Sequence, residues 1–293
     1  MYGSALLIGN GLNRASDNIA WIDMLDELRK SYHVKETKSL YNFPLEYERI
    51  YLAAKKRAEV QSPYRLNRRV AKLLPNVSDL ELHKIFLSLP VEDIMTTNYD
   101  YYLETAQNEL FSRKHASSNT NERLHSVFRQ INTGNKKFWH IHGECACPAS
   151  ICLGYQHYCS YLSRMFNFLT YPHPGICQKP YIRHFLSKGQ IQQDSWLTRF
   201  FTHDIYILGL SMSLIEIDLW WLLSYRIRLL LDSPHLAITN QIHYYYVESY
   251  PDEEQLSLLL SMGVQLHPIP LICDNWTEMY HKIRADIKVR IKI

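Results

Sequence analysis

Two histidines that lie two residues apart are the first side chains in this sequence that could carry acid–base chemistry. They are His140 and His142 in the stretch KKFWHIHGE, and Gly143 follows the second of them. The residues before the pair predict a strand, on which side chains two positions apart point to the same face. Imidazole titrates near neutral pH, which suits a general base. We therefore predict that His142 is a general base at the end of a strand and that Gly143 leaves room for a substrate.

The same histidines allow two other interpretations. Cys145 and Cys147 follow closely, so the four side chains together could bind zinc. Zinc sites usually use C-x-x-C or longer spacings, and a single residue separates these two cysteines. The histidine pair could also be purely structural. Of the three interpretations we favour the base, and we expect no metal.

Polar residues and glycines follow three other stretches that resemble strands. These stretches are LLIGNGLNRAS, IMTTNYD and GLSMSLIEID. Glycine lets the backbone approach a ligand closely, and N–H groups at the start of a helix can bind phosphate. The candidate ligand-binding residues are Gly9, Asn10, Gly11, Asn13, Thr97, Asn98, Asp100, Gly209, Ser211 and Asp218.

Local structural roles remain open for these residues. The first stretch could be only a tight turn into a helix, and Asp100 could cap the helix that begins near Tyr101. Asp218 is expected one to two turns into a helix, where it could be an ordinary solvated side chain. Four glycines at predicted strand ends are harder to explain in this way than one, and they are Gly9, Gly11, Gly143 and Gly209.

The elements that position these residues alternate between strands and helices. Strand patterns occur in SALLI, VEDIMTTNYD, KKFWHI, DIYILGL, IHYYYVES and VQLHPI, with helical patterns between them. This order predicts an α/β fold, a Rossmann-like parallel sheet with helices on both faces. Ligands of such sheets bind outside the carboxyl ends of the strands, where the candidate residues are expected.

One domain is expected over residues 1–293, with two insertions. Residues from about 16 to 89 are helical and too numerous for a simple crossover, so they should form a cap or small subdomain. A smaller insertion is expected from about 145 to 190. Gly263 is predicted to close a helix, and the alternating tail IKVRIKI predicts an edge strand.

Composition and charge argue against several classes of protein. The net charge is only +3 and 46 % of the residues are hydrophobic, so direct binding of nucleic acid is not expected. No apolar run approaches the roughly 20 residues of a membrane span, and no signal peptide is recognisable. We expect a cytoplasmic protein with free thiols at its six cysteines. The basic stretches KKR and RLNRR could be solvated, or could contact an acidic partner or DNA.

In chain order, IGNGLNRAS, TTNYD, HIHG and ILGLSMS resemble the motifs of a sirtuin-like domain. The chain looks like the bacterial sirtuin-like NAD hydrolases of anti-phage defence systems, over residues from about 5 to 250. The resemblance implies that GNG with Asn13 holds the pyrophosphate of NAD. It also implies that Gly209 and Ser211 lie on the phosphate and adenosine side.

The same resemblance implies the chemistry. Asn98 and Asp100 would hold the nicotinamide ribose, an attacking water and the carboxamide, and His142 would accept a proton. NAD, as the substrate, would be cleaved to nicotinamide and ADP-ribose through an oxocarbenium-like state. Such a reaction mainly requires positioning of the ribose and water and stabilisation of charge.

Departures from the family pattern leave two alternatives open. Asn10 and Asn13 replace a small residue and a serine in the first loop, and Thr97 replaces a glutamine. The paired C-x-x-C motifs and the F-G-E segment of deacetylating sirtuins are missing, which argues against deacylation more than against NAD binding. A sirtuin-type deacylase or ADP-ribosyltransferase is one alternative. A non-catalytic nucleotide-binding or scaffold subunit is the other alternative.

The resemblance also implies partners. Members of this branch are typically silent until they are triggered in abortive infection, and they often form homo-oligomers. Some work with a separately encoded HerA-type ATPase, which is a candidate partner here. This chain contains no Walker A sequence, so it cannot supply ATPase activity itself.

Overall fold

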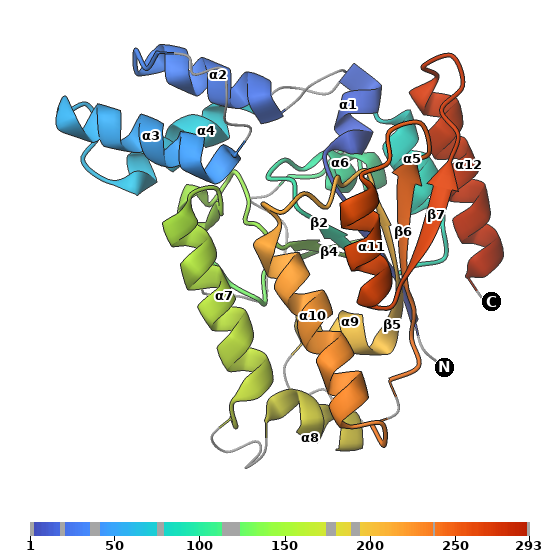
Figure 1. The fold of residues 1–293 in the computed structure, drawn as a ribbon. Coiled ribbons are helices and arrows are strands. Elements are labelled where there is room, and N and C mark those ends of the chain that lie inside the picture. Colours follow the sequence, from blue (N-terminus) through green and yellow to red (C-terminus); the bar gives the residue numbers. More distant parts are fainter. Residues whose placement is uncertain are drawn as a thin grey trace.

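The computed structural model of the chain describes residues 3–17, 21–35, 42–74, 79–112, 124–173, 180–188, 194–236 and 238–291. One sheet has the strand order β3-β4-β2-β1-β5-β6-β7 (Figure 1). Its strands are β1 (Gly3–Ile8), β2 (Asp93–Thr96), β3 (Gln130–Thr133), β4 (Lys136–His140), β5 (His203–Leu208), β6 (Ile242–Val247) and β7 (Val264–Ile269). Every neighbouring pair is parallel except β3 and β4. The predicted α/β fold is confirmed.

Helices cover both faces of this sheet, as predicted. Alternate residues of β1 explain why, since Ala5 and Leu7 enter one core while Leu6 and Ile8 enter the other. Helices α7 to α11 pack on the first face, and α1, α5, α6 and α12 pack on the second. The helices are α1 (Gly11–Asp17), α2 (Trp21–Ser31), α3 (Phe43–Lys56), α4 (Pro63–Leu73), α5 (Glu81–Leu87), α6 (Tyr102–Gln107), the short 3-10 helix η1 (Pro148–Ser150), α7 (Tyr155–Thr170), α8 (Tyr181–Lys188), α9 (Trp196–Thr202), α10 (Ile217–Asp232), α11 (Glu253–Ser261) and α12 (Trp276–Arg290).

The antiparallel edge strand β3 has no clear signal in the sequence. Its residues QINT are short and polar, so they show no strand pattern. A two-residue loop joins Thr133 to Lys136, and Gly134 opens that loop with a φ of 59°. Glycine at the first loop position is what a type II′ hairpin requires. The hairpin therefore depends on the turn and on pairing with β4.

Helices α2, α3 and α4 form a third, smaller core that projects beyond the sheet (Figure 1). Tyr99, Ile151 and Leu153 from the carboxyl edge of the sheet belong to the same core. The buried Asn67 of α4 donates a hydrogen bond to the Ile151 carbonyl at 3.3 Å. These helices are thus anchored to the loops that follow the strands. Helix α5, in the same predicted insertion, instead packs on the sheet.

The C-terminal tail was assigned wrongly from its alternating pattern. Residues up to Arg290 continue α12, and 292–293 lie outside the described residues. Ile283 and Ile287, one helical turn apart, are buried, whereas Val289 is 84 % exposed. Helical spacing therefore decides which apolar residues are buried. By contrast, Gly263 follows α11 with a φ of 76°, as predicted for a helix end.

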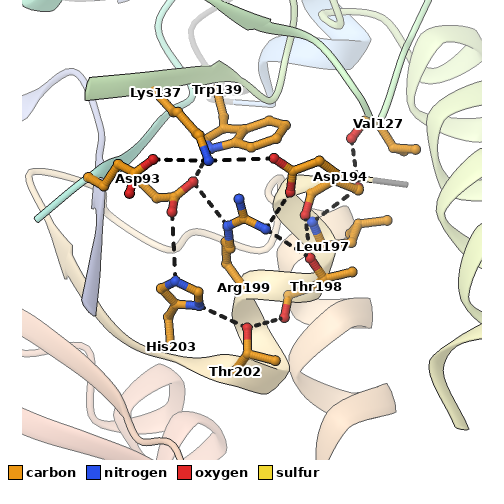
Figure 2. Close-up of polar contacts among 12 residues, drawn as sticks. Asp93, Val127, Lys137, Trp139, Asp194, Leu197, Thr198, Arg199, Thr202 and His203 are labelled. Atoms are coloured by element: carbon orange, nitrogen blue, oxygen red, sulfur yellow. Dashed lines mark hydrogen bonds and ion pairs between the residues drawn. The ribbon is translucent and has the colours of Figure 1, made fainter. Parts of the chain in front are cut away.

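A buried ionic network ties α9 to the amino edge of the sheet (Figure 2). Asp93, at the start of β2, accepts a hydrogen bond from Trp139 Nε1 at 2.7 Å and lies 3.0 Å from Arg199 Nε. Arg199 also donates to Asp194 at 2.6 Å, and its guanidinium lies over the Trp139 ring. Burial would lower the pKa of Arg199, but Asp93 and Asp194 raise it. This network lies at the opposite end of the strands from the candidate residues, so we interpret it as structural.

Two further expectations can be compared with the described part of the chain. The cysteines there form no disulfide, as predicted, and Cys177 lies outside that part. No helix among the described residues is both long and apolar enough to cross a membrane.

Candidate active site at the carboxyl edge of the sheet

A cavity of about 860 Å³ opens at the carboxyl ends of the strands. Its walls come from the loops after β1, β2, β4 and β5, from β6, and from parts of α1, α2, α3, α7, α11 and α12. This volume is within the range of small-molecule and cofactor sites. The predicted site residues that line it are Asn10, Gly11, Thr97, His142, Gly209 and Ser211. Gly9, Asn13, Asn98, Asp100 and Asp218 are not part of the lining.

His142 and Asp218 form a buried pair beside the cavity. His142 Nε2 lies 2.8 Å from Asp218 Oδ2, and Asp218 is 0 % exposed. Asp218 is the second residue of α10. Our expectation that it lies one to two turns into the helix was therefore wrong, and so was the solvated alternative. The helix begins later than its apolar pattern suggests, because residues 213–216 form a turn before it.

A second carboxylate, Glu216, also faces His142. Glu216 Oε2 lies 3.9 Å from His142 Nδ1. Burial would lower the pKa of His142, but Asp218 and then Glu216 outweigh burial and raise it to about 9. Burial raises the pKa of Glu216 to about 7, against the opposing effect of His142. The raised pKa favours the protonated form of His142, which lies between the carboxyl groups of Asp218 and Glu216.

His140 has a different environment from His142. Strand β4 ends at His140. The prediction that the His140 and His142 side chains share one face of a strand was therefore wrong. His140 Nε2 lies 2.6 Å from Glu104 Oε1, and its Nδ1 lies 3.0 Å from the Asn98 carbonyl oxygen. It is 1 % exposed and braces the loop after β2. These contacts support the structural interpretation for His140.

The alternative zinc set of two histidines and two cysteines is not assembled. Within the described ranges, the acidic, histidine and cysteine side chains close enough to share a metal ion are His142, Glu216 and Asp218. One potential ligand atom from each lies within 4.8 Å of the others. The hydrogen bond between His142 and Asp218 accounts for the approach of that pair.

The glycines after β1 and β5 serve the contact between their two loops. Gly9 N donates to the Leu208 carbonyl at 3.0 Å and Gly11 N to the Gly209 carbonyl at 2.7 Å. A Cβ at Gly9 would lie 2.5 Å from the Gly209 oxygen. The Gly11 N–H, expected to bind phosphate, is thus already used within the protein. Asn10 and Ser211 still line the cavity from these loops.

Gly143 does not leave room for a ligand. Its φ is 96°, and a Cβ would lie against the Ser150 carbonyl and 2.8 Å from the Ile151 nitrogen. The space beside Gly143 is therefore occupied by the backbone that follows η1. Our prediction that this glycine makes room for a substrate was wrong, since its partner is the protein itself.

Asn13 and Asp100 meet across 87 residues of sequence. Asn13 Nδ2 donates to Asp100 Oδ2 at 3.0 Å, and His83 Nε2 lies 2.9 Å from Asn13 Oδ1. Asp100 Oδ1 also accepts a hydrogen bond from the Tyr102 N–H, which is the capping role considered above. Burial raises the pKa of Asp100 to about 6. This pair connects α1 to the loop after β2.

Asn98 is buried with one atom unsatisfied. Its backbone N–H donates to Thr96 Oγ1, which itself donates to the Ile8 carbonyl. Its Nδ2 makes a long contact of 3.4 Å to the Gly9 carbonyl, and its Oδ1 has no hydrogen-bond partner among the described residues. Asp218 Oδ1 and Glu216 Oε2 are likewise buried without a hydrogen-bond partner among the described residues. Buried acceptors without donors cost free energy, so a bound donor or cation would stabilise these groups.

Several cavity residues were not identified from the sequence. Glu216, Arg14, Tyr99 and Tyr158 line the cavity, and the Tyr158 ring contacts His142 edge-on with ring centroids 5.7 Å apart. The one available signal was the E-I-D spacing of LIEID, which places Glu216 two residues before Asp218. The tyrosines lie in stretches whose patterns indicate only a loop and a helix.

The fold and the site together define a Rossmann-like α/β protein with a ligand cavity at the carboxyl edge of its sheet. The comparison with protein families is more specific. Residues 92–266 match the SIR2-like domain, which is more than half of the 293 residues, so the chain belongs to the SIR2-like family. The match covers the candidate residues from Thr97 to Asp218, whereas the loop after β1 lies outside it. No curated protein matches the chain.

Proposed function

We propose that this SIR2-like protein hydrolyses the N-glycosidic bond of NAD and releases nicotinamide and ADP-ribose. One observation carries the proposal. The buried pair of His142 and Asp218 lies beside a cavity of about 860 Å³ at the strand ends of a SIR2-like sheet. SIR2-like membership supports a role connected with NAD in general.

NAD would extend along the cavity from His142 toward α12. The nicotinamide ribose would lie near His142, Thr97 and Tyr158, and the pyrophosphate near Asn10 and Arg14, which all line the cavity. A guanidinium is suited to phosphate oxygens. The aromatic side chains at the other end would contact the adenosine, and they include Tyr246, Trp276 and Tyr280.

In the proposed reaction, a water oxygen bonds to C1′ of the ribose while the bond from C1′ to the nicotinamide nitrogen breaks. The electron pair of that bond neutralises the pyridinium, and the water loses one proton. Asn98 Oδ1, which lacks a donor, would accept a hydrogen bond from the water or from a ribose hydroxyl. His142 would take the proton in its neutral form. A bound pyridinium lowers the pKa of His142 because like charges repel, which makes that form accessible.

The test is direct incubation of the purified protein with NAD, with nicotinamide and ADP-ribose followed by chromatography. His142→Ala and Asn98→Ala should each lower the rate by roughly 10²–10⁴-fold, the usual contribution of such groups. His281→Ala, on the exposed face of α12, is the matched control and should leave the rate unchanged. NAD that binds but stays intact in every mixture would argue for the scaffold alternative. ADP-ribose that is recovered on a protein would argue for a transferase.

We also propose, from the resemblance alone, that the protein is a cytoplasmic effector of abortive infection that acts as a homo-oligomer. A separately encoded HerA-type ATPase is the candidate partner. Light scattering of the purified chain tests the oligomer. Phage challenge of cells that express the chain with and without its neighbouring genes tests the defence role, and the His142→Ala variant should not protect.

A further inference from the structure

We propose that Glu216 forms a subsite for a cationic ring, so that the cavity selects the pyridinium form of the nicotinamide dinucleotide over its neutral dihydro form. This inference rests on the proposed function, because it assigns a binding role at the same site. It adds a residue and a specificity that the SIR2-like match does not provide.

Glu216 lies in the wall of the cavity, immediately before α10. It is the N-cap residue of this helix, and its side chain is 16 % exposed. Its Oε2 atom has no hydrogen-bond partner among the described residues. The side chain is therefore mostly removed from water, although Glu216 still forms part of the cavity wall.

The charges around His142 do not balance when both neighbouring carboxylates are ionised. His142 supplies one positive charge, and Asp218 at 2.8 Å offsets it. Glu216, at 3.9 Å from His142, adds a second negative charge when it is ionised. The fully buried Asp218 also has an oxygen, Oδ1, without a hydrogen-bond donor in the described structure. With both carboxylates ionised, the pair can therefore balance one more cation than the protein supplies, and Glu216 is the member of the pair that lines the cavity.

Aromatic side chains surround Glu216 in the cavity wall. Tyr99 and Tyr158 line the cavity next to Glu216, and aromatic faces attract cations. A small metal ion would gain little from these rings, whereas a flat cationic ring fits both the rings and the carboxylate. The titratable groups that face Glu216 come from four other segments and from α10 itself, and they are His142, Tyr99, Cys152, Tyr158 and Asp218.

The experiment measures binding of three probes, NAD⁺, NADH and ADP-ribose, to the full-length chain by calorimetry. Asn98→Ala serves as the background in which cleavage is slow. Adding Glu216→Gln should weaken NAD⁺ binding roughly tenfold or more, as expected when a buried charge partner is removed. Binding of NADH and ADP-ribose should change less than about twofold, since neither carries the pyridinium. Glu254→Gln, an exposed carboxylate in the same cavity wall, is the matched control.

The possible outcomes separate the hypotheses. An equal loss for all three probes would assign Glu216 a structural role and overturn the inference, and so would an unchanged NAD⁺ affinity. NAD⁺ binding that requires added Zn²⁺ or Mg²⁺ and disappears with EDTA would assign the carboxylates to a metal instead. If the chain with Glu216 intact binds none of the probes, the proposed function fails together with this inference.

Discussion

His142 Nε2 and Asp218 Oδ2 lie 2.8 Å apart although 76 residues separate them in the sequence. His142 follows β4 and Asp218 lies in the first turn of α10, so the hydrogen bond joins the loop after β4 to the start of this helix. The bond holds one ring nitrogen of His142 and favours its protonated form. Orientation of an imidazole by a buried carboxylate is a recurring feature of catalytic sites.

The pair predicts a pH dependence. The pKa of His142 is raised to about 9, and a base acts in its neutral form, so kcat/KM should rise with pH toward about 9. Asp218→Asn removes the main group that raises this pKa and leaves the opposing effect of burial. The rise should therefore move to lower pH, and the plateau should fall roughly 10²-fold or more because the ring loses its orientation. The pH profiles of kcat/KM test this, and identical profiles would count against the assignment.

We expect the buried carboxyl group of Asp100 to make the stability of the protein depend on pH. Burial raises its pKa to about 6, so the ionised carboxyl disfavours folding above that pH. Asp100→Asn removes the charge and keeps an acceptor for the Tyr102 N–H. The free energy of unfolding of the variant, relative to wild type, should increase between about pH 4 and pH 6.5 by about 2 kcal/mol. Urea denaturation at several pH values measures it, and a constant difference would show that Asp100 is well solvated.

At Gly143, we expect a single added methyl group to lower the stability of the protein strongly. Gly143→Ala places a Cβ against the Ser150 and Ile151 backbone at a φ of 96° and should cost about 2–4 kcal/mol. Gly263→Ala is the matched control, since its φ is also positive but the nearest atom to its Cβ would be Ile227 Cδ1 at 3.6 Å. That variant should cost only about 1 kcal/mol. Thermal unfolding compares the two, and equal losses would mean that backbone conformation alone requires glycine.

The amino-edge network predicts a loss of stability that is separate from activity. Asp93→Ala leaves the Arg199 guanidinium paired only with Asp194 and should cost about 3 kcal/mol, because a buried charge loses a partner. Glu278→Ala, which removes an exposed partner of Lys282, should cost less than about 1 kcal/mol. Chemical denaturation gives both values. Below its unfolding temperature, Asp93→Ala should keep the NAD cleavage rate per folded molecule, and a large loss of rate would link the two edges of the sheet.

The order of elements was determined by the sequence alone. Apolar residues with strand or helical spacing predicted the parallel α/β sheet, and polar motifs after the strands predicted which edge of the sheet carries the cavity. Such patterns are local, and side-chain periodicity directly reflects which face of an element is buried. The six predicted residues that line the cavity were found in this way.

Only the tertiary structure decided which groups meet. The sequence shows that His140 and His142 are neighbours, but packing places the first against Glu104 and the second against Asp218. It likewise brings the backbone of Ser150 against Gly143 and Glu216 to the cavity, and it makes the alternating tail helical by burying Ile287. Periodicity determines the face on which a side chain lies, whereas its partner depends on how distant segments pack, and that information is not local.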